Sequence, residues 1–157
     1  MEIYFLRHGE YQKTAGLKDA ECPLSDQGAS RMEREASFFA RLGLRLDLII
    51  SSPLLRARQT AEIVARALRL PDALVADERM APGFGPDALF LILREHAGLK
   101  AAMLVGHEPD FSRTIASCTG GGRVECRKGS LARVDLESSA SLEGNLAWLL
   151  PPEVLAL

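Results

Sequence analysis

The chain has 157 residues, 47% of them hydrophobic and 25% charged, which is typical of a soluble globular protein. We expect one domain spanning 1–157, because this length can bury a sizeable core. The net charge of −2 argues against nucleic acid or a membrane surface as a partner, since either would need a basic field. Charged residues interrupt the long apolar stretches, so no membrane-spanning segment is predicted.

The chain contains three cysteines, Cys22, Cys118 and Cys126. They are an odd number and form no CxxC pair, which argues against a disulfide framework and against a zinc site. Met1 leads into an apolar run within three residues, without the basic segment of a signal peptide. Both observations favour a protein of the reducing cytoplasm.

The first predicted element is a short buried strand at 3–6, which ends in Arg7, His8 and Gly9. Glycine allows a sharp exit from the strand. A guanidinium and an imidazole at this point are costly near a core unless an anion lies there. We interpret His8 as the nucleophile of a reaction centre. On the tripeptide alone, a strand that happens to end in two polar residues is an equally good interpretation.

A polar loop at 10–19 comes next, and apolar spacing then predicts a helix from Ser25, its N-cap, to Gly43 at its end. A second strand is expected at 46–51. Ser52 then suits the N-cap of a second helix, with Pro53 at its first helical position. A short third strand follows at 74–76.

The second half of the chain repeats the alternation of strands and helices. A helix at 87–96, a strongly apolar strand at 101–105 and a helix at 110–118 are predicted, and His107 lies between the last two. Beyond a glycine-rich break, strands at 131–136 and 142–150 are expected to pair.

This order predicts an α/β fold with three layers, in which a mainly parallel sheet carries helices on both faces. Ligands of such sheets bind beyond the carboxyl ends of the strands. His8, the segment 51–53 and His107 each follow a different strand, so we expect them at the same edge. Residues distant in sequence are thereby brought together around His8.

Arg56 belongs to the first turn of the second helix, outside the apolar stripe of that helix. Free N–H groups at the helix start favour anions, and guanidinium groups bind phosphate oxygens in bidentate fashion. Two arginines and two histidines from three strand ends suit a phosphoryl group better than a carboxylate. The alternative for Arg56 alone is a solvated helix charge.

Three motifs together resemble those of the histidine phosphatase superfamily, which has the phosphoglycerate-mutase-like fold. They are Arg-His-Gly at 7–9 after the first strand, Ser-Ser-Pro-Leu-Leu-Arg-Ala-Arg-Gln-Thr at 51–60, and Val-Gly-His at 105–107. The short chain and its tail, Trp-Leu-Leu-Pro-Pro at 148–152, are most similar to the SixA-type branch, the phosphohistidine phosphatases. The resemblance extends over the whole chain.

The resemblance implies a two-step phosphoryl transfer. His8 would attack phosphorus in line and carry a phosphohistidine intermediate, which water then hydrolyses. Arg7, Arg56 and His107 would bind the three non-bridging oxygens. The arginines would also keep the reacting nitrogen of His8 unprotonated. Because they already supply positive charge, we expect no metal and no other cofactor.

Two carboxylates are candidates for the proton donor. Glu78 follows the third strand, where metabolite phosphatases and mutases of this superfamily carry their acid, but the Gly-aromatic-Glu-Gly run that usually follows is absent. Glu108 comes directly after His107, where a related branch has an aspartic acid. The alternative for Glu108 is a solvated side chain that interacts with the helix dipole. We name Glu78 as the candidate acid.

The resemblance favours a phosphohistidine-bearing protein as substrate and partner. Imidazole is a better leaving group than an alkoxide, and a short chain leaves little material for a lid over a small metabolite. The alternatives are a small-molecule phosphomonoester phosphatase or mutase on the same fold, and a phosphate-binding module without catalysis.

One position departs from the pattern of the SixA-type branch. Cys22 stands where many such chains have an arginine, directly before Pro23 and Leu24. An outer phosphate contact is therefore either missing or supplied by Lys13 or Lys18. We interpret Lys128, near the start of the strand at 131–136, as solvated.

Overall fold

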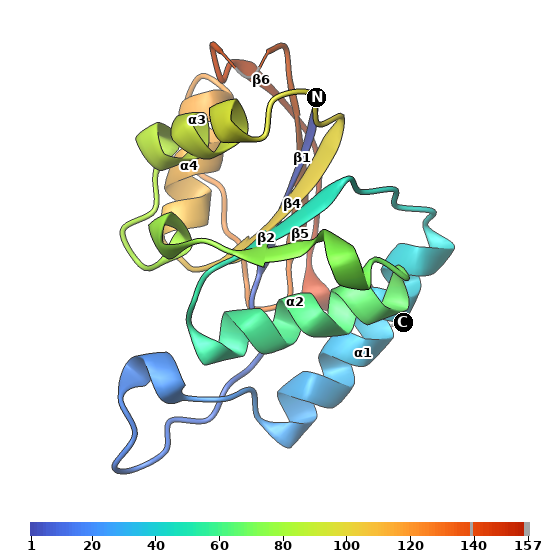
Figure 1. Ribbon diagram of the computed structural model, residues 1–157, viewed down its shortest axis with the longest axis vertical. Coiled ribbons are helices and arrows are strands. Elements are labelled where there is room, and N and C mark those ends of the chain that lie inside the picture. Colours follow the sequence, from blue (N-terminus) through green and yellow to red (C-terminus); the bar gives the residue numbers. More distant parts are fainter. Residues whose placement is uncertain (139, 156–157) are drawn as a thin grey trace.

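The computed structural model describes residues 1–138 and 140–155 and is built around a six-stranded sheet with the order β3-β2-β4-β1-β5-β6 (Figure 1). Strands β1 to β4 are parallel, β5 runs antiparallel to β1, and β6 pairs antiparallel with β5. The strands are β1 Glu2–Arg7, β2 Leu48–Ser51, β3 Leu74–Ala76, β4 Ala101–Gly106, β5 Leu131–Leu136 and β6 Gly144–Leu150. The predicted pairing of the last two strands is confirmed.

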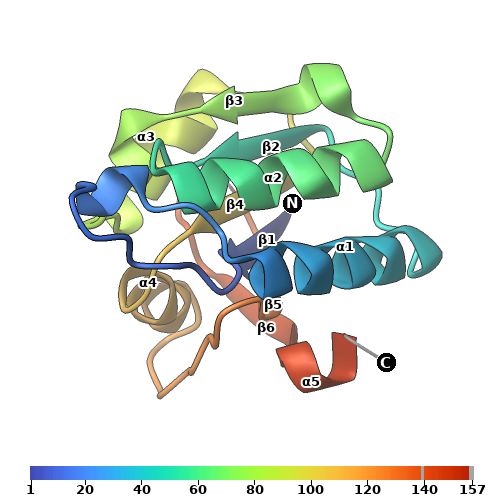
Figure 2. The same cartoon turned by 90° about the horizontal axis from the view of Figure 1, so that it is seen from below.

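Helices cover both faces of this sheet, as Figure 2 shows from below. Helices α1, α2 and α5 pack on one face, and α3 and α4 pack on the other. The helices are α1 Asp26–Arg41, α2 Leu55–Ala67, α3 Pro86–Glu95, α4 Asp110–Cys118 and α5 Pro152–Leu155, with short 3-10 helices η1 Asp19–Glu21, η2 Pro71–Ala73 and η3 Glu78–Met80. The predicted fold class, a three-layer α/β fold with a mainly parallel sheet, is confirmed.

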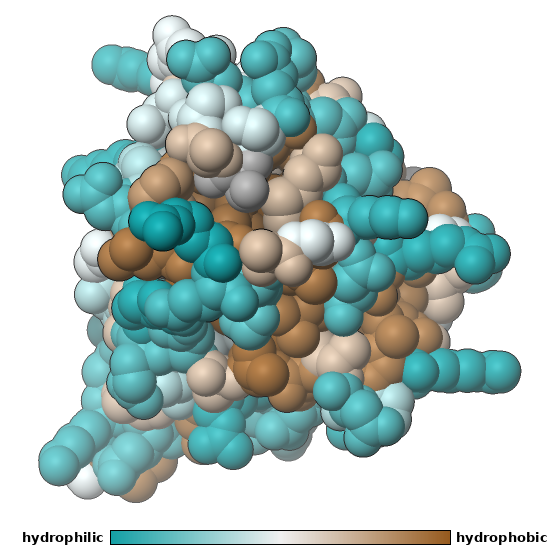
Figure 3. Space-filling model, turned by 45° about the horizontal axis from the view of Figure 1, so that its top comes forward, coloured by the Kyte–Doolittle hydropathy of each residue, from teal (hydrophilic) through white to brown (hydrophobic). Residues whose placement is uncertain are grey.

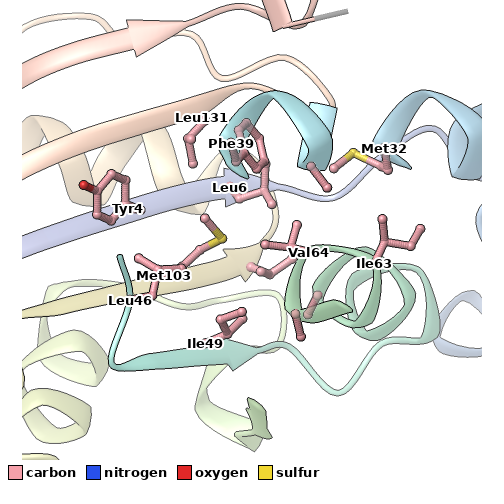
Figure 4. Packing of buried hydrophobic residues seen from close by; sticks show 14 of the residues in the cluster. Tyr4, Leu6, Met32, Phe39, Leu46, Ile49, Ile63, Val64, Met103 and Leu131 are labelled. Carbon is pink, nitrogen blue, oxygen red and sulfur yellow. The ribbon is translucent and has the colours of Figure 1, made fainter. Parts of the chain in front are cut away.

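Strand β1 is buried on both faces because its side chains alternate between two apolar clusters. Tyr4 and Leu6 pack with Met32 and Phe39 of α1 and with Val64 of α2 (Figure 4). On the other face, the side chains of β1 meet those of α3 and α4; this second cluster includes Ile3, Phe5, Leu89, Ile92, Phe111 and Ile115. The sheet is therefore held rigidly between two cores, and its carboxyl edge is a fixed platform.

The start of the second helix differs from the prediction. Helix α2 begins at Leu55 with Leu54 as N-cap, so Ser52 is not the N-cap and Pro53 is not its first residue. The Ser52 hydroxyl accepts a hydrogen bond from the backbone N–H of Leu54 at 3.3 Å and also lies against His107. That hydroxyl is engaged before the helix begins.

Most other element bounds differ from the predictions by one or two residues. Ser25 is confirmed as the N-cap of α1, since its side chain accepts from the backbone N–H of Gly28. Gly43 follows the end of α1 with a positive φ of 75°. Helix α5 and the 3-10 helices were not predicted, because three or four residues are too few to show a helical period.

Within the described residues, no helix is long and apolar enough to span a membrane. On the face that Figure 3 shows, hydrophobic side chains reach the surface between hydrophilic ones.

Candidate active site

Strand register brings His8 and His107 together at the carboxyl edge of the sheet. Arg7 pairs with Gly106 in the parallel register of β1 and β4, so the residue after each strand end is a histidine. The two ring centroids lie 5.1 Å apart. Both side chains are buried, with His8 only 4% exposed. The expected juxtaposition of the two histidines at one sheet edge is therefore present.

The backbone determines which nitrogen of His8 can react. Nδ1 lies 2.8 Å from the carbonyl oxygen of Gly9. A carbonyl oxygen only accepts hydrogen bonds, so Nδ1 must carry the proton of the neutral ring and Nε2 holds the lone pair. Burial is the main cause that lowers the pKa of His8 to about 3; His107, Arg56 and Arg7 add to it, against the opposing effect of the Gly9 carbonyl. At neutral pH, His8 therefore has an unprotonated Nε2.

His107 is neutral for the same reasons. Burial, followed by the charge of Arg56, lowers its pKa to about 4. Its Nε2 lies 2.7 Å from the Ser52 hydroxyl, which follows strand β2. The end of β2 thus holds the His107 ring in place at the end of β4.

Backbone and side-chain acceptors hold both arginines in the site, but some of their N–H groups have no acceptor among the described residues. Arg7 donates from Nη1 to the carbonyl oxygen of Cys126 at 3.0 Å. Arg56, only 5% exposed, donates from Nη1 to the backbone oxygen of Asp19 at 2.7 Å and from Nη2 to its carboxylate at 2.8 Å. Within residues 1–138 and 140–155, the buried Nε of each arginine has no partner. Buried N–H groups in this state favour an additional anionic acceptor.

The loop after His8 is docked on α1 and α2, across the carboxyl end of the sheet (Figures 1 and 2). The N–H of Gly9 donates to the Thr60 hydroxyl at 3.2 Å, and the N–H of Ser25 donates to the oxygen of Glu10 at 3.1 Å. A Cβ at Gly28 would lie 2.0 Å from that same Glu10 oxygen. Only glycine at position 28 allows the loop to approach α1 so closely.

Tyr11, a residue of the loop after His8, packs beside His8 and Arg56. Its ring centroid is 5.5 Å from that of His8, in an edge-on arrangement, and the guanidinium carbon of Arg56 lies 4.3 Å from it. The ring face therefore supports Arg56 next to His8. No role for Tyr11 could be predicted from the sequence, because a single tyrosine in a polar loop belongs to no motif.

Comparison with known proteins identifies the family. The model of the histidine phosphatase superfamily (branch 1) matches residues 3–81, half of the chain. The chain belongs to the histidine phosphatase superfamily. This membership supports hydrolase chemistry of the phosphatase type.

Three relatives illustrate the relationship. An uncharacterized protein of Picosynechococcus is 36% identical over 147 residues, which cover 90% of this chain and 87% of that protein. Phosphohistidine phosphatase SixA of Escherichia coli is 24% identical over 155 residues, covering 97% of this chain and 94% of that protein. The structure of the protein histidine phosphatase SixA complexed with tungstate superposes with a TM-score of 0.87 at 23% identity, covering 97% of each chain.

Neither carboxylate named from the sequence contacts the histidines of this histidine phosphatase superfamily chain. Glu78 lies in η3 after β3 and is exposed; its carboxylate has no hydrogen-bond partner among the described residues. Glu108 accepts from the backbone N–H of Ser112 at 3.0 Å and from the Ser112 hydroxyl, so it is bound to the first turn of α4. The carboxylate that binds Arg56 is that of Asp19, a residue of the polar loop for which the sequence indicated no role.

The surroundings of Cys22 differ in part from expectation. Cys22 is buried, and its thiol lies 3.5 Å from the carbonyl oxygen of Lys18. Lys128 is not simply solvated, because its Nζ binds Glu10 at 2.8 Å and lies 5.3 Å from the Tyr11 ring centroid. Lys128 thus brings an ammonium group to the loop after His8, beside Tyr11. Within the described ranges, no three His, Cys, Asp or Glu side chains are grouped to hold a metal ion.

Proposed function

We propose that this chain is a SixA-like phosphohistidine phosphatase, which hydrolyses phosphohistidine on a protein through a phosphohistidine intermediate of its own. The observation that carries the proposal is the neutral His8, whose Nδ1 is bound by the Gly9 carbonyl while its Nε2 faces a site with two arginines. The first of its two chemical steps needs such a nucleophile.

In the first step, Nε2 of His8 attacks phosphorus in line and the bond to the leaving group breaks. Arg7, Arg56 and His107 bind the three non-bridging oxygens and stabilise the charge that they carry in the transition state. The buried Nε of each arginine has no partner among the described residues, and a phosphoryl oxygen would supply one. In the second step, water attacks the phosphohistidine and phosphate leaves, with His8 restored as the neutral imidazole.

Two observations support a phosphorylated protein as the substrate. The Escherichia coli relative is a phosphohistidine phosphatase, and the alignment covers nearly the full length of both chains. The loop 9–25 packs on α1 and α2, and within the described residues no long insertion is present that could form a closed lid over a small metabolite. A side chain on another protein can therefore reach the site. The free, buried cysteines favour a cytoplasmic location as part of the same proposal.

The test measures phosphate release from a histidine-containing phosphotransfer protein that has been phosphorylated on histidine. We expect the wild-type chain to release phosphate from it with a higher kcat/KM than from sugar phosphates or phosphoglycerate. The trapped enzyme should carry acid-labile phosphate on His8, detected by mass spectrometry.

The matched control is His8→Ala, which should neither release phosphate nor become labelled. Addition of EDTA should leave the rate unchanged, because the positive charge comes from arginines. A clear preference for the small phosphomonoesters would contradict the proposed substrate and favour a metabolite phosphatase or mutase.

A further inference from the structure

Asp19 places a carboxylate at the mouth of the site. It begins η1, and its side chain is 60% exposed although it binds the buried Arg56. The hydrogen bond from Arg56 lowers the pKa of Asp19, and the charges of Arg56 and Lys13 lower it further. The negative charges of Asp110 and then of Asp19 raise the pKa of His107, against the larger opposing effects of burial and Arg56. The carboxylate therefore borders the same space as Arg56 and His107.

His8 lies at the bottom of the site and Asp19 at its opening, which are the positions that in-line displacement requires for the nucleophile and for the acid at the leaving group. His8 is buried at the floor, at the end of β1, whereas Asp19 reaches in from the exposed loop. In-line attack puts the leaving group on the side of phosphorus opposite the attacking nitrogen. An attack from the floor therefore pushes the leaving atom toward the mouth, where Asp19 lies.

We propose that Asp19 is the general acid of this site, a role that rests on the phosphatase function proposed above. In the free chain, the Asp19 carboxylate accepts a hydrogen bond from Nη2 of the Arg56 guanidinium. A bound phosphoryl group replaces it there, because a dianion binds a guanidinium more strongly than a monoanion does. The displaced carboxylate then lies next to a like charge, which raises its pKa and favours uptake of a proton. Substrate binding itself thus prepares the acid.

The proton balance closes over the two steps. As the His8 Nε2–phosphorus bond forms and the bond to the leaving atom breaks, the Asp19 carboxyl gives its proton to that leaving nitrogen or oxygen. The Asp19 carboxylate then accepts a proton from the water that attacks phosphorus, while the Nε2–phosphorus bond breaks. Asp19 ends the cycle protonated, and it loses that proton when phosphate leaves and Arg56 binds it again.

The test compares Asp19→Asn with the wild-type chain on a series of phosphate esters, from p-nitrophenyl phosphate through phenyl phosphate to benzyl phosphate. Asparagine can still accept a hydrogen bond from Arg56 but cannot donate a carboxyl proton. We expect kcat/KM to fall about 100-fold or more for benzyl phosphate and less than about 3-fold for p-nitrophenyl phosphate, whose leaving group needs little protonation.

Glu21→Gln is the matched control. Glu21 lies in the same 3-10 turn, and among the described residues its carboxylate accepts a hydrogen bond only from the backbone N–H of Lys18. Its kcat/KM should match the wild type across the series. Because asparagine keeps an acceptor for Arg56 and the side chain is mostly exposed, Asp19→Asn should still fold, with a somewhat lower melting temperature since the charge of Asp19 is lost.

Two results would overturn the role of Asp19. An equal loss across all three esters would mean that Asp19 only positions Arg56, and a gain across all three would mean that it only competes with phosphate. The esters contain no phosphohistidine, so the outcome can be read even if no phosphohistidine protein is a substrate. Full activity of His8→Ala on these esters would instead contradict the proposed function itself.

Discussion

Arginines and carboxylates lie at both ends of the central strands. At the amino ends, each charge in a group around Arg133 has a partner of opposite sign, whereas at the carboxyl ends the pairing is incomplete among the described residues. At the amino edge, Arg133 binds Asp135 at 2.7 Å and Glu2 at 2.9 Å, and the Tyr4 hydroxyl donates to Glu2 at 2.6 Å. Burial and the nearby Glu2 raise the pKa of Tyr4 to about 12, so it stays a neutral donor. Every charge in this group has a protein partner of opposite sign.

At the carboxyl edge, the two arginines are only partly paired within the described residues. Arg7 and Arg56 lie beside two buried, neutral histidines, and Asp19 is the carboxylate that reaches Arg56. Buried cations without matched anions are unfavourable in a folded chain on its own. This difference indicates that the charges at the amino edge are neutralised within the protein, whereas those at the carboxyl edge need an anionic ligand.

The largest effect is expected at the carboxyl edge from His8→Ala. We expect kcat/KM to fall by at least about 10⁴-fold, since the nucleophile and with it the covalent route are lost. Steady-state assays with p-nitrophenyl phosphate measure this. The melting temperature serves as a control for folding. Turnover near the wild-type rate would mean that this edge binds anions without using His8.

Arg56→Lys tests whether the fork of Arg56, rather than its charge alone, is needed. A lysine keeps the positive charge but cannot bind two oxygens in parallel. We expect kcat/KM to fall about 10²-fold, as for the loss of one donor to a transition-state oxygen. The inhibition constant of vanadate should rise in parallel. Unchanged kinetics would show that Arg56 acts only as a point charge.

The sequence was sufficient to predict the elements with long or strong patterns. The apolar run at 3–6, the stripe of α1 and the run at 101–105 determine the layers, because burial of these side chains is the dominant favourable term. The same patterns place His8 and His107 after parallel strands. Their proximity then follows from register, which the hydrophobic pattern specifies.

The contacts of short and polar segments could not be predicted. Asp19 approaches Arg56 only because the loop 9–25 is docked on α1 and α2, through Thr60, Gly28 and other tertiary contacts. Serine is a preferred N-cap residue, but the hydroxyl of Ser52 is hydrogen-bonded to the His107 side chain and does not cap α2. Lys128 reaches Glu10 across 118 positions of sequence. Each depends on tertiary structure, which overrides local propensity.

The pH dependence of stability sharpens the comparison between the edges. The pKa values of His8 and His107 are lowered to about 3 and about 4, whereas an unfolded histidine titrates near 6.5. Between these values the unfolded chain binds more protons than the folded chain, so stability falls as pH falls below about 6.5.

We expect the two histidines together to lower the free energy of unfolding by on the order of 4 kcal/mol between pH 7 and pH 5, about half from each. Urea denaturation at both pH values measures this loss. In His8→Asn/His107→Asn, the part of the loss that comes from the histidines should be absent. An identical pH dependence in this double variant would show that other groups cause it.

The smallest effect is expected at the amino edge, from Arg133→Ala. The Arg133 side chain is 28% exposed, and ion pairs that are partly open to water contribute little, so the free energy of unfolding should fall by about 1 kcal/mol or less. Because the histidines lie at the opposite ends of the same strands, kcat/KM and vanadate inhibition should stay at their wild-type values. Urea denaturation and the p-nitrophenyl phosphate assay measure the two properties on one preparation. A change in kinetics without a change in stability would mean that the two edges are coupled through β1, and that the amino edge is more than a structural end of the sheet.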